Sequence, residues 1–304
     1  MIMVPKLLIT GATGFAGRNL INYFSVDDKF LLKPLDLRSN WKNDLSNDSL
    51  AIVHLAGKAH DLKRVSGPEE YYQVNYELTK QLYDAFLKSE AKKFIFISSV
   101  KAAADSVEKA LSEDMTPAPE THYGKSKLLA EEYIRSQPLP AGKSYYILRP
   151  CMIHGPGNKG NLSLLYKLVA KGIPYPLADF HNQRSFLSVE NLCFVIKEIV
   201  ERDDISSGIY HLADNEPLST NDLIRLLSQA LGKSPRLLKI PTLVVKALAK
   251  IGDRLHLPLT SERLQKLTEN YVVNTQKIKL ALNKDLPLSA RDGILLTARA
   301  LKNA

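Results

Sequence analysis

The sequence predicts an α/β fold with a doubly wound parallel sheet and a smaller, mostly α-helical C-terminal lobe. Short apolar runs alternate with amphipathic helical segments over the first 150 residues, the order expected of a parallel sheet with helices on both faces. The runs are continuously apolar, as in strands buried on both sides. After Pro150 the strand signals become sparse, whereas helical patterns continue.

The elements are predicted from the spacing of apolar residues and from the residues that end each run. Strands are predicted at residues 6–10, 29–35, 50–55, 93–98, 144–148 and 209–212. Helices are predicted at residues 15–24, 69–87, 122–135, 161–171, 188–201, 220–231, 241–252 and 290–301. We expect two units, one formed by residues 1–155 with returns near 180–212, and one formed by residues 156–304.

Composition excludes several protein classes. The chain has 304 residues, of which 45% are hydrophobic and 24% charged, so disordered, collagen-like and disulfide-scaffold proteins are not indicated. No apolar run approaches the ~20 residues that span a bilayer, and the first residues do not resemble a secretory signal. Cys151 and Cys193 are expected to be core residues. We therefore expect a cytoplasmic protein in a reducing compartment.

The net charge of +9 is concentrated at one end of the chain. Residues 233–304 hold 14 basic and 5 acidic residues, so they carry the whole excess. This asymmetry indicates either an anionic partner, such as a diphosphate-bearing substrate, or a solvated basic face. No basic run with interleaved aromatics occurs, which argues against nucleic acid. Residues 241–257 could lie on an anionic membrane surface, although such helices more often cover a core or a subunit contact.

A glycine-rich turn joins the first predicted strand to the first predicted helix. Its G-x-x-G-x-x-G spacing provides a tight turn, close approach to a pyrophosphate and helix–strand packing. The phosphates then lie at a helix N-terminus, where free N–H groups favour an anion. We therefore predict a Rossmann fold, with residues 1–155 as its dinucleotide-binding domain. The predicted contacts are Gly11, Thr13, Gly14, Phe15 and Gly17.

Asp36 ends the second predicted strand, 19 residues after Gly17. An acid at this position can accept both ribose hydroxyls of NAD and repel the 2′-phosphate of NADP. Arg38 lies two residues later and could pair with that phosphate. We favour NAD as the cofactor, with NADP possible.

Tyr123 and Lys127 share one face of a predicted helix because they are four residues apart. A nearby ammonium favours the phenolate and lowers the pKa of a tyrosine. Tyr76 and Lys80 have the same spacing. Only Tyr123 follows the fourth strand, however, and active sites of open parallel sheets form at the strand ends. We therefore interpret the earlier pair as structural.

Taken together, the motifs resemble the extended short-chain dehydrogenase/reductase family, in particular its NAD-dependent nucleotide-sugar epimerases and 4-ketoreductases, of the UDP-glucose 4-epimerase type. The resemblance covers about residues 6–195 in the family's order. The matching segments are residues 10–17 and 54–57, Asn75 with Thr79, residues 97–99 and 123–127, Arg149-Pro150, His154-Gly155-Pro156 and Arg184.

The resemblance implies roles for individual residues. It makes Tyr123 the general acid/base and Ser99 the hydrogen-bond partner of the reacting sugar hydroxyl. Lys127 would hold the nicotinamide ribose and lower the tyrosine pKa, whereas Ser98 would be structural. Further cofactor contacts would be Asp44, Leu45, Leu55, Ala56, Gly57, Asn75, Tyr123, Lys127 and Pro150.

The substrate diphosphate has three candidate partners. Asn161 opens a predicted helix and could meet the diphosphate there, although a plain N-cap is equally consistent. Arg184 could pair with the diphosphate bidentately. Arg263 is a weaker candidate for the same role.

Departures from the family pattern reduce the number of reactions that the resemblance allows. Related 4,6-dehydratases carry an Asp-Glu pair directly after the position of Ser99, where this chain has Val100 and Lys101. The sequence therefore argues against a dehydratase. Lys58, His60 and Lys101 follow motifs that border the pocket and could set substrate choice.

Other site classes have no matching pattern. The seven histidines form no metal-type pair, so we predict no metal. The sequence also has no G-x-S-x-G elbow and no Walker loop.

The function predicted best is an NAD-dependent 4-epimerase of a nucleotide-diphosphate sugar, UDP-linked. One alternative is an NAD(P)H-dependent UDP-4-keto-6-deoxy-sugar 4-reductase of surface-polysaccharide synthesis. Another is a non-catalytic dinucleotide-binding regulator. The family also implies a homodimer formed through the helices at residues 69–87 and 121–137.

Overall fold

The computed structural model describes residues 4–27, 29–45, 49–59, 67–158, 160–255 and 259–302. The strands in this part of the chain are β1 (Lys6–Thr10), β2 (Leu31–Leu35), β3 (Ser49–His54), β4 (Lys93–Ile97), β5 (Ser144–Pro150), β6 (Met152–His154), β7 (Phe186–Ser188) and β8 (Gly208–Leu212). The helices are α1 (Phe15–Phe24), α2 (Pro68–Tyr72), α3 (Leu78–Lys88), α4 (His122–Ser136), α5 (Asn161–Ala170), α6 (Val189–Glu201), α7 (Thr220–Ala230), α8 (Thr242–Leu255), α9 (Ser261–Thr268), α10 (Gln276–Leu282) and α11 (Ala290–Lys302). Short helical turns are η1 (Trp41–Asp44), η2 (Gln73–Glu77) and η3 (Val100–Ala102).

The main sheet has six strands in the order β2-β1-β3-β4-β5-β8, all paired in parallel. The chain runs from β1 outward to β2 and then returns to β3 on the other side of β1. In open α/β sheets, ligands bind beside the carboxyl ends of strands at such a switch point. The predicted doubly wound parallel sheet is confirmed, and its switch point places Gly11, which follows β1, beside Ala56, which follows β3.

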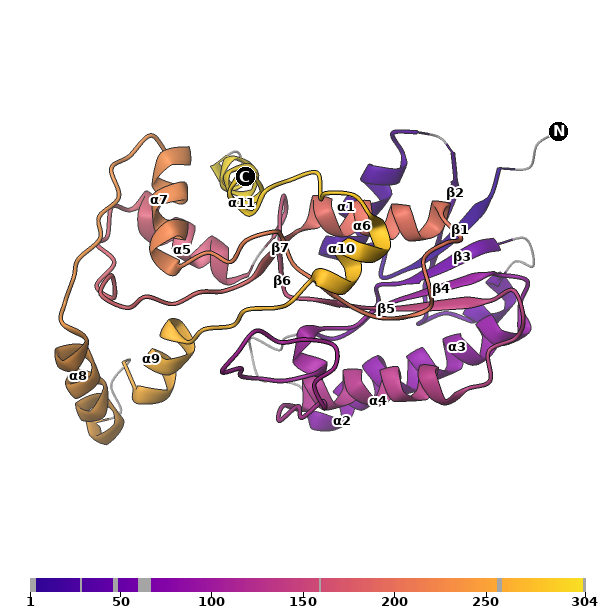
Figure 1. Ribbon diagram of the computed structural model, residues 1–304, viewed down its shortest axis with the longest axis horizontal. Helices are drawn as coiled ribbons and strands as arrows, with labels where there is room; N and C mark the ends of the chain where they lie inside the picture. Colours follow the sequence, from indigo (N-terminus) through magenta and orange to yellow (C-terminus); the bar gives the residue numbers. More distant parts are fainter. Residues whose placement is uncertain are drawn as a thin grey trace.

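Helices cover both faces of this sheet. Alternate strand residues point to opposite faces, so Leu7 and Ile9 join the apolar cluster that includes α1 and α6, whereas Leu8 joins the cluster that includes α3 and α4. Figure 1 shows α1, α6 and α10 on one side of the sheet and α2, α3 and α4 on the other. This burial on both faces explains why the strands are continuously apolar.

A third apolar cluster forms the core of the C-terminal lobe, with buried residues contributed by α5, α7, α8, α9 and α11. These helices lie at one end of the molecule, beyond the carboxyl ends of the sheet strands (Figure 1). β6 and β7 form a separate two-stranded sheet, whereas β8 joins the main sheet. The lobe is mostly helical, as expected, and the boundary at residues 155 and 156 stays a prediction.

Several local predictions differ from the structure. The predicted helix at residues 69–87 is interrupted by η2, a π-helical turn that contains the buried residue Asn75. The second strand begins at Leu31 rather than at residue 29. The helices α9 and α10 and the strands β6 and β7 were not predicted. They have 8, 7, 3 and 3 residues, too few for apolar periodicity to be distinct.

Cys151 and Cys193 are buried and unpaired in the core, as expected. Within the described ranges, no helix is both long enough and apolar enough to cross a bilayer. Among the same residues, no cluster of three or more histidine, cysteine or acidic side chains is arranged to hold a metal ion.

Candidate active site

The glycine turn after β1 passes very close to the end of β3. Gly11 has a φ of +68°, and a Cβ on it would lie 2.7 Å from the Ala56 backbone nitrogen. A Cβ on Gly17 would lie 2.2 Å from the Gly11 carbonyl oxygen. Gly14 precedes α1 and offers no side-chain cap to its first N–H groups. Thr13 and Gly14 are exposed, and Phe15 is partly buried, so the helix N-terminus is accessible to an anion such as a pyrophosphate.

Asp36 follows β2 directly and is held by Arg38. The Arg38 guanidinium donates from Nε to Oδ1 at 2.9 Å and from Nη2 to Oδ2 at 3.0 Å. These hydrogen bonds lower the pKa of the Asp36 carboxyl, so this acid stays ionised and can accept hydrogen bonds from ribose hydroxyls. Both side chains are exposed. Asp44 ends η1 and is exposed, and Leu45 follows it half-buried.

A chain of buried hydrogen bonds connects the end of β3 to η2. The Ala56 N–H donates to Thr10 Oγ1 at 3.1 Å, and Thr10 Oγ1 lies 2.7 Å from His54 Nδ1. His54 Nε2 lies 2.8 Å from Thr79 Oγ1, which itself donates to the Asn75 carbonyl at 2.8 Å. Because the Thr79 hydrogen is used on that carbonyl, Thr79 accepts from His54 Nε2–H and His54 Nδ1 accepts from Thr10. A neutral His54 satisfies every donor and acceptor of this chain.

Burial, with a smaller contribution from the Lys127 ammonium, lowers the pKa of His54 to about 3. The unfolded chain, with an ordinary histidine pKa near 6.5, binds one proton more than the folded chain between these values. Stability from His54 is therefore complete above about pH 6.5 and falls as the pH drops toward the folded pKa. We expect a loss of about 2 kcal/mol between about pH 7 and pH 5 from this group alone.

Urea unfolding at both pH values checks this expectation, with His54→Gln as the comparison. His211, whose pKa burial lowers to about 4, contributes in both proteins and cancels. The variant is expected to lose about 2 kcal/mol less than the wild type over this range. An identical pH dependence in the two proteins would contradict a neutral, buried His54.

Asn75 connects η2 to the segment after β3 and to α4. Its Oδ1 accepts from the Lys58 N–H at 2.8 Å, and its Nδ2 donates to the Lys58 carbonyl at 3.0 Å and to Ser126 Oγ at 3.0 Å. A Cβ on Gly57 would lie 2.9 Å from Lys127 Nζ and 3.1 Å from Asn75 Oδ1. The structure therefore brings together Gly57, Asn75 and Lys127, three residues predicted from separate motifs.

Ser99 and Tyr123 meet at the carboxyl end of β4. The Ser99 side chain lies near enough to the Tyr123 hydroxyl to act on its pKa, and the Tyr71 ring lies edge-on to the Tyr123 ring at 6.4 Å. Gly124 permits this approach, because a Cβ on it would lie 2.3 Å from the Lys101 carbonyl oxygen. The role of Gly124 was missed by the sequence analysis, although it lies inside the quoted Tyr-Gly-Lys-Ser-Lys segment.

The lowering of the Tyr123 pKa by Lys127 stays a prediction, because Lys127 is not among the groups that shift this pKa here. Burial raises the pKa of Tyr123, and the Ser99 side chain only partly offsets it. Lys127 Nζ donates instead to the Ile97 carbonyl at 2.8 Å. Burial also lowers the pKa of Lys127 to about 8, so the lysine remains mostly charged at neutral pH.

Ser98 belongs to a buried ionic network behind the site. Its hydroxyl donates to the Glu131 carboxylate. The same carboxylate accepts hydrogen bonds from Arg149 Nε at 3.0 and 3.1 Å and from Arg149 Nη2 at 2.5 Å. Arg149 and Glu131 are both 1% exposed. This contact fixes α4 against β5 and leaves Ser98 fully engaged, in agreement with its expected structural role. Pro150, the next residue, is buried at the end of β5.

The residues predicted for the substrate diphosphate lie on the C-terminal lobe side. Arg184 Nη1 donates to the Lys266 carbonyl at 3.3 Å, and Nη2 lies 3.7 Å from the Glu269 carboxylate. Arg263 is exposed on α9, and Asn161 is the first residue of α5. The structure thus links Arg184 to the C-terminal end of α9 through Lys266 and Glu269.

Two of the three pocket-bordering residues can be placed. Lys101 Nζ donates to the Asp105 carbonyl at 2.6 Å and lies 4.2 Å from the Tyr271 ring centre. Burial lowers its pKa, and the charges of Glu269 and Arg184 act on it. Lys58 pairs with Glu70 at 2.6 Å. The third, His60, lies outside the described residues.

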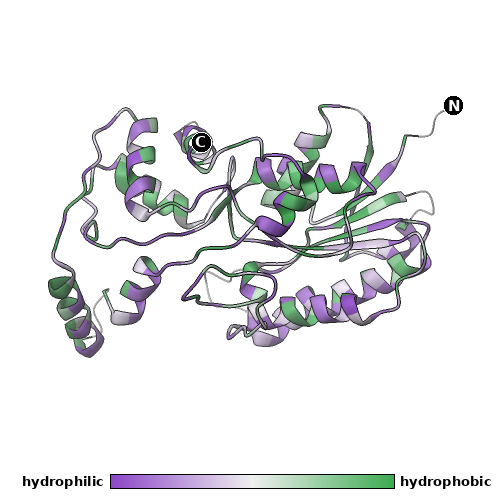
Figure 2. Ribbon diagram, viewed as in Figure 1, coloured by the Kyte–Doolittle hydropathy of each residue, from purple (hydrophilic) through white to green (hydrophobic). Residues whose placement is uncertain are grey.

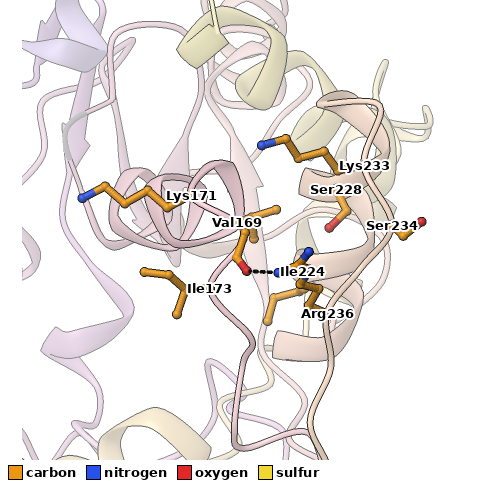
Figure 3. Close-up of a pocket in the computed structure, with 9 residues that line it drawn as sticks. Val169, Lys171, Ile173, Ile224, Ser228, Lys233, Ser234 and Arg236 are labelled. Atoms are coloured by element: carbon orange, nitrogen blue, oxygen red, sulfur yellow. Dashed lines mark hydrogen bonds between the residues drawn. The ribbon is translucent and has the colours of Figure 1, made fainter.

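A cavity of about 500 Å³ lies away from these residues, between the C-terminal ends of α5 and α7 (Figure 3). Two of its basic side chains donate hydrogen bonds to carbonyl groups at the end of α5. Lys233 donates to the Ala170 carbonyl at 2.5 Å, and Arg236 donates to the Gly172 carbonyl at 2.9 Å. Cations commonly satisfy the last carbonyls of a helix in this way. No predicted site residue lines this cavity.

Comparison with known proteins points to one family. The model described as the NAD dependent epimerase/dehydratase family matches residues 7–213. A UDP-glucose 4-epimerase of Vibrio cholerae is 29% identical, with 99% of this chain and 97% of that protein covered. An N-acetyl-alpha-D-glucosaminyl-diphospho-ditrans,octacis-undecaprenol 4-epimerase of Escherichia coli O157:H7 is 31% identical, with coverage of 79% and 75%. A GDP-6-deoxy-D-mannose reductase of Pseudomonas aeruginosa is 25% identical, with coverage of 74% and 80%.

Solved structures share the fold. The structure described as MoeE5 in complex with UDP-glucose and NAD has a TM-score of 0.76 and 19% identity. The alignment covers 98% of this chain and 99% of that one. The shared architecture therefore includes both the parallel sheet and the C-terminal lobe.

Proposed function

This chain belongs to the NAD-dependent epimerase/dehydratase family, and we propose that it is a 4-epimerase of a UDP-linked sugar. Its relatives are enzymes that include an epimerase and a reductase by name, so the chain is an enzyme rather than a non-catalytic regulator. The observation that carries the proposal is the proximity of the Ser99 and Tyr123 side chains at the strand ends, with Lys127 beside Gly57. The glycine turn begins at the neighbouring switch point.

The residues present fit the family's NAD. Gly11 and Gly17 leave the close backbone approach that a pyrophosphate needs, and the uncapped start of α1 offers N–H groups. Asp36 supplies an ionised acceptor for a ribose. When bound, NAD supplies a hydride acceptor and donor. Arg38 already contacts Asp36 and could turn toward a 2′-phosphate, so NADP stays an alternative.

Tyr123 is the proposed acid/base for the sugar 4-hydroxyl. It would accept the proton of that hydroxyl when carbon 4 is oxidised and return a proton to the oxygen when carbon 4 is reduced. Ser99 would hold the same oxygen by a hydrogen bond. Lys127, mostly protonated at neutral pH, would donate to a ribose hydroxyl and stabilise negative charge on Tyr123 once that oxygen is within reach.

Arg184 is the proposed partner of the substrate diphosphate. Its guanidinium lies 3.7 Å from the Glu269 carboxylate, a long contact that leaves donors available for a bidentate phosphate. The start of α5 at Asn161 would offer N–H groups to the same diphosphate, and Arg263 is a further candidate. The excess positive charge of residues 233–304 supports an anionic substrate on this lobe.

A 4-reductase of a UDP-4-keto-6-deoxy sugar is the second candidate, because the same residues would serve it and one relative is named a reductase. An epimerase returns its cofactor to the starting state at each turnover, whereas a reductase consumes NAD(P)H. The cofactor released on denaturing freshly purified protein should therefore be near-stoichiometric NAD for an epimerase.

Such protein, incubated with UDP-sugars without added cofactor, should form the 4-epimer, detected by proton NMR. Consumption of NAD(P)H only with a UDP-4-keto-6-deoxy sugar would instead identify the reductase. Failure to bind either dinucleotide would contradict both functions.

We also propose a homodimer formed through α3 and α4. These helices pack together on one face of the sheet (Figure 1), and α4 exposes the apolar Leu129. Light scattering of the eluted protein measures the mass that decides between a monomer and a dimer.

A further inference from the structure

The helix α8 lies at the end of the molecule farthest from the sheet strands (Figure 1). One of its faces is buried and consists of Val245, Ala249 and Gly252. The helix packs against α9. These residues anchor α8 to the apolar cluster of the lobe. The helix is therefore fixed in orientation, and its remaining surface is set by the fold.

An apolar stripe runs along the exposed side of α8. Val244, Leu248, Ile251 and Leu255 are spaced by four, three and four residues, so they share one face. Their exposed fractions are 48%, 50%, 48% and 65%. Figure 2 shows hydrophobic and hydrophilic residues side by side on this helix. Isolated exposed leucines are ordinary, but four aligned on one helix face form a contiguous patch.

Basic side chains border this stripe. At about 100° per residue, Lys250 and Arg254 lie on one flank of the stripe, and Lys246 lies beyond them. All three are exposed, and within the described ranges none has a carboxylate partner. The only acid of the helix, Asp253, accepts from the Ser261 N–H at 2.8 Å and the Ser261 hydroxyl at 2.6 Å. With three basic side chains and one acid, α8 carries a net charge of +2.

We propose that α8 is an interfacial helix that docks the protein onto an anionic lipid bilayer. The stripe would enter the boundary between headgroups and acyl chains, while Lys250 and Arg254 would contact anionic headgroups. The helix has 14 residues, too few to span a bilayer, so it lies along the surface. α9 would then lie beside the bilayer, together with the Lys266 carbonyl that holds Arg184.

Charge favours a membrane over a second copy of this chain as the occupant. Residues 233–304 carry the entire net charge of +9, so two copies joined through α8 would bring like charges together. An anionic bilayer instead complements both the apolar stripe and its basic flank. The proposal concerns a surface on α8 and does not depend on the reaction assigned to the active site.

Co-sedimentation with lipid vesicles tests the proposal on the full chain. The wild type is expected to bind vesicles that contain about a third phosphatidylglycerol at least about tenfold more tightly than pure phosphatidylcholine vesicles, since each basic residue near the surface is worth about 1 kcal/mol. The double variant Leu248→Glu/Ile251→Glu should weaken binding by about tenfold or more. Lys250→Gln/Arg254→Gln should also weaken it and reduce its salt dependence.

The matched control is Val26→Glu/Leu280→Glu, which places two glutamates at exposed apolar positions away from α8. It should bind vesicles almost as the wild type does. The proposal is overturned if the wild type does not bind anionic vesicles, or if the control loses as much binding as the α8 variant. It is also overturned if the glutamates on α8 convert a dimer to a monomer without changing vesicle binding.

Discussion

Tyr123→Phe is expected to reduce the turnover number by about 10²–10⁴-fold, the usual contribution of a positioned acid/base. The phenyl ring keeps the shape and burial of the side chain, and only the hydroxyl that meets Ser99 is lost. The cofactor contacts proposed for the glycine turn and Asp36 are untouched. The fold and the affinity for NAD should therefore stay close to those of the wild type.

Steady-state epimerisation or reduction, with NAD affinity from fluorescence titration, measures both quantities. Tyr76→Phe is the matched control, because Tyr76 precedes Lys80 by the same four residues. The Lys80 Nζ lies 5.3 Å from the Tyr133 ring centre, away from Ser99. The control should retain activity. Wild-type turnover in Tyr123→Phe would remove Tyr123 from the mechanism and restore the case for a non-catalytic site.

Gly17→Ala is expected to destabilise the protein and to abolish measurable NAD binding. A Cβ there would lie 2.2 Å from the Gly11 carbonyl oxygen and 2.7 Å from the Ala12 Cα. Both are backbone atoms, so the turn or α1 must shift to make room. Overpacking of this kind costs about 1–3 kcal/mol. The shift also moves the N–H groups at the start of α1, on which a pyrophosphate would rest.

Gly142→Ala separates this effect from a general intolerance of alanine at glycine positions. Gly142 has a φ of +78°, but nothing lies within 4 Å of a Cβ built on it. The Gly142→Ala variant should lose about 1–2 kcal/mol of its free energy of unfolding from backbone strain alone. Its NAD affinity should be unchanged. Denaturant unfolding and fluorescence titration of both variants give the comparison. A Gly17→Ala protein that binds NAD as tightly as the wild type would show that the turn does not hold the pyrophosphate.

The sequence by itself was sufficient where the signal is local. Apolar periodicity predicted β1 and α1 with the bounds that the structure has, because strand and helix spacing depend on neighbouring residues. The glycine spacing predicted the turn in the same way. It also placed Tyr123 and Lys127 on one helix, α4, since four residues make about one turn.

The tertiary structure decided what depends on long-range contacts. The hydrogen-bond chain through His54 joins residues 44 and 25 positions apart, and its existence requires β1, β3 and η2 to be adjacent. The raised pKa of Tyr123 is of the same kind, because burial is set by surrounding segments and outweighs the effect of the Ser99 side chain. The pairing of Glu131 with Arg149 likewise depends on α4 packing over β5.

The same distinction applies to α8. The sequence determined that residues 241–257 combine apolar and basic side chains, because composition and spacing are local properties. Only the tertiary structure decided which apolar side chains are buried and which remain exposed, since the lobe core covers one face and leaves Val244, Leu248, Ile251 and Leu255 uncovered. Local chemistry was thus readable along the chain, whereas burial and charge environment were fixed by packing between distant segments.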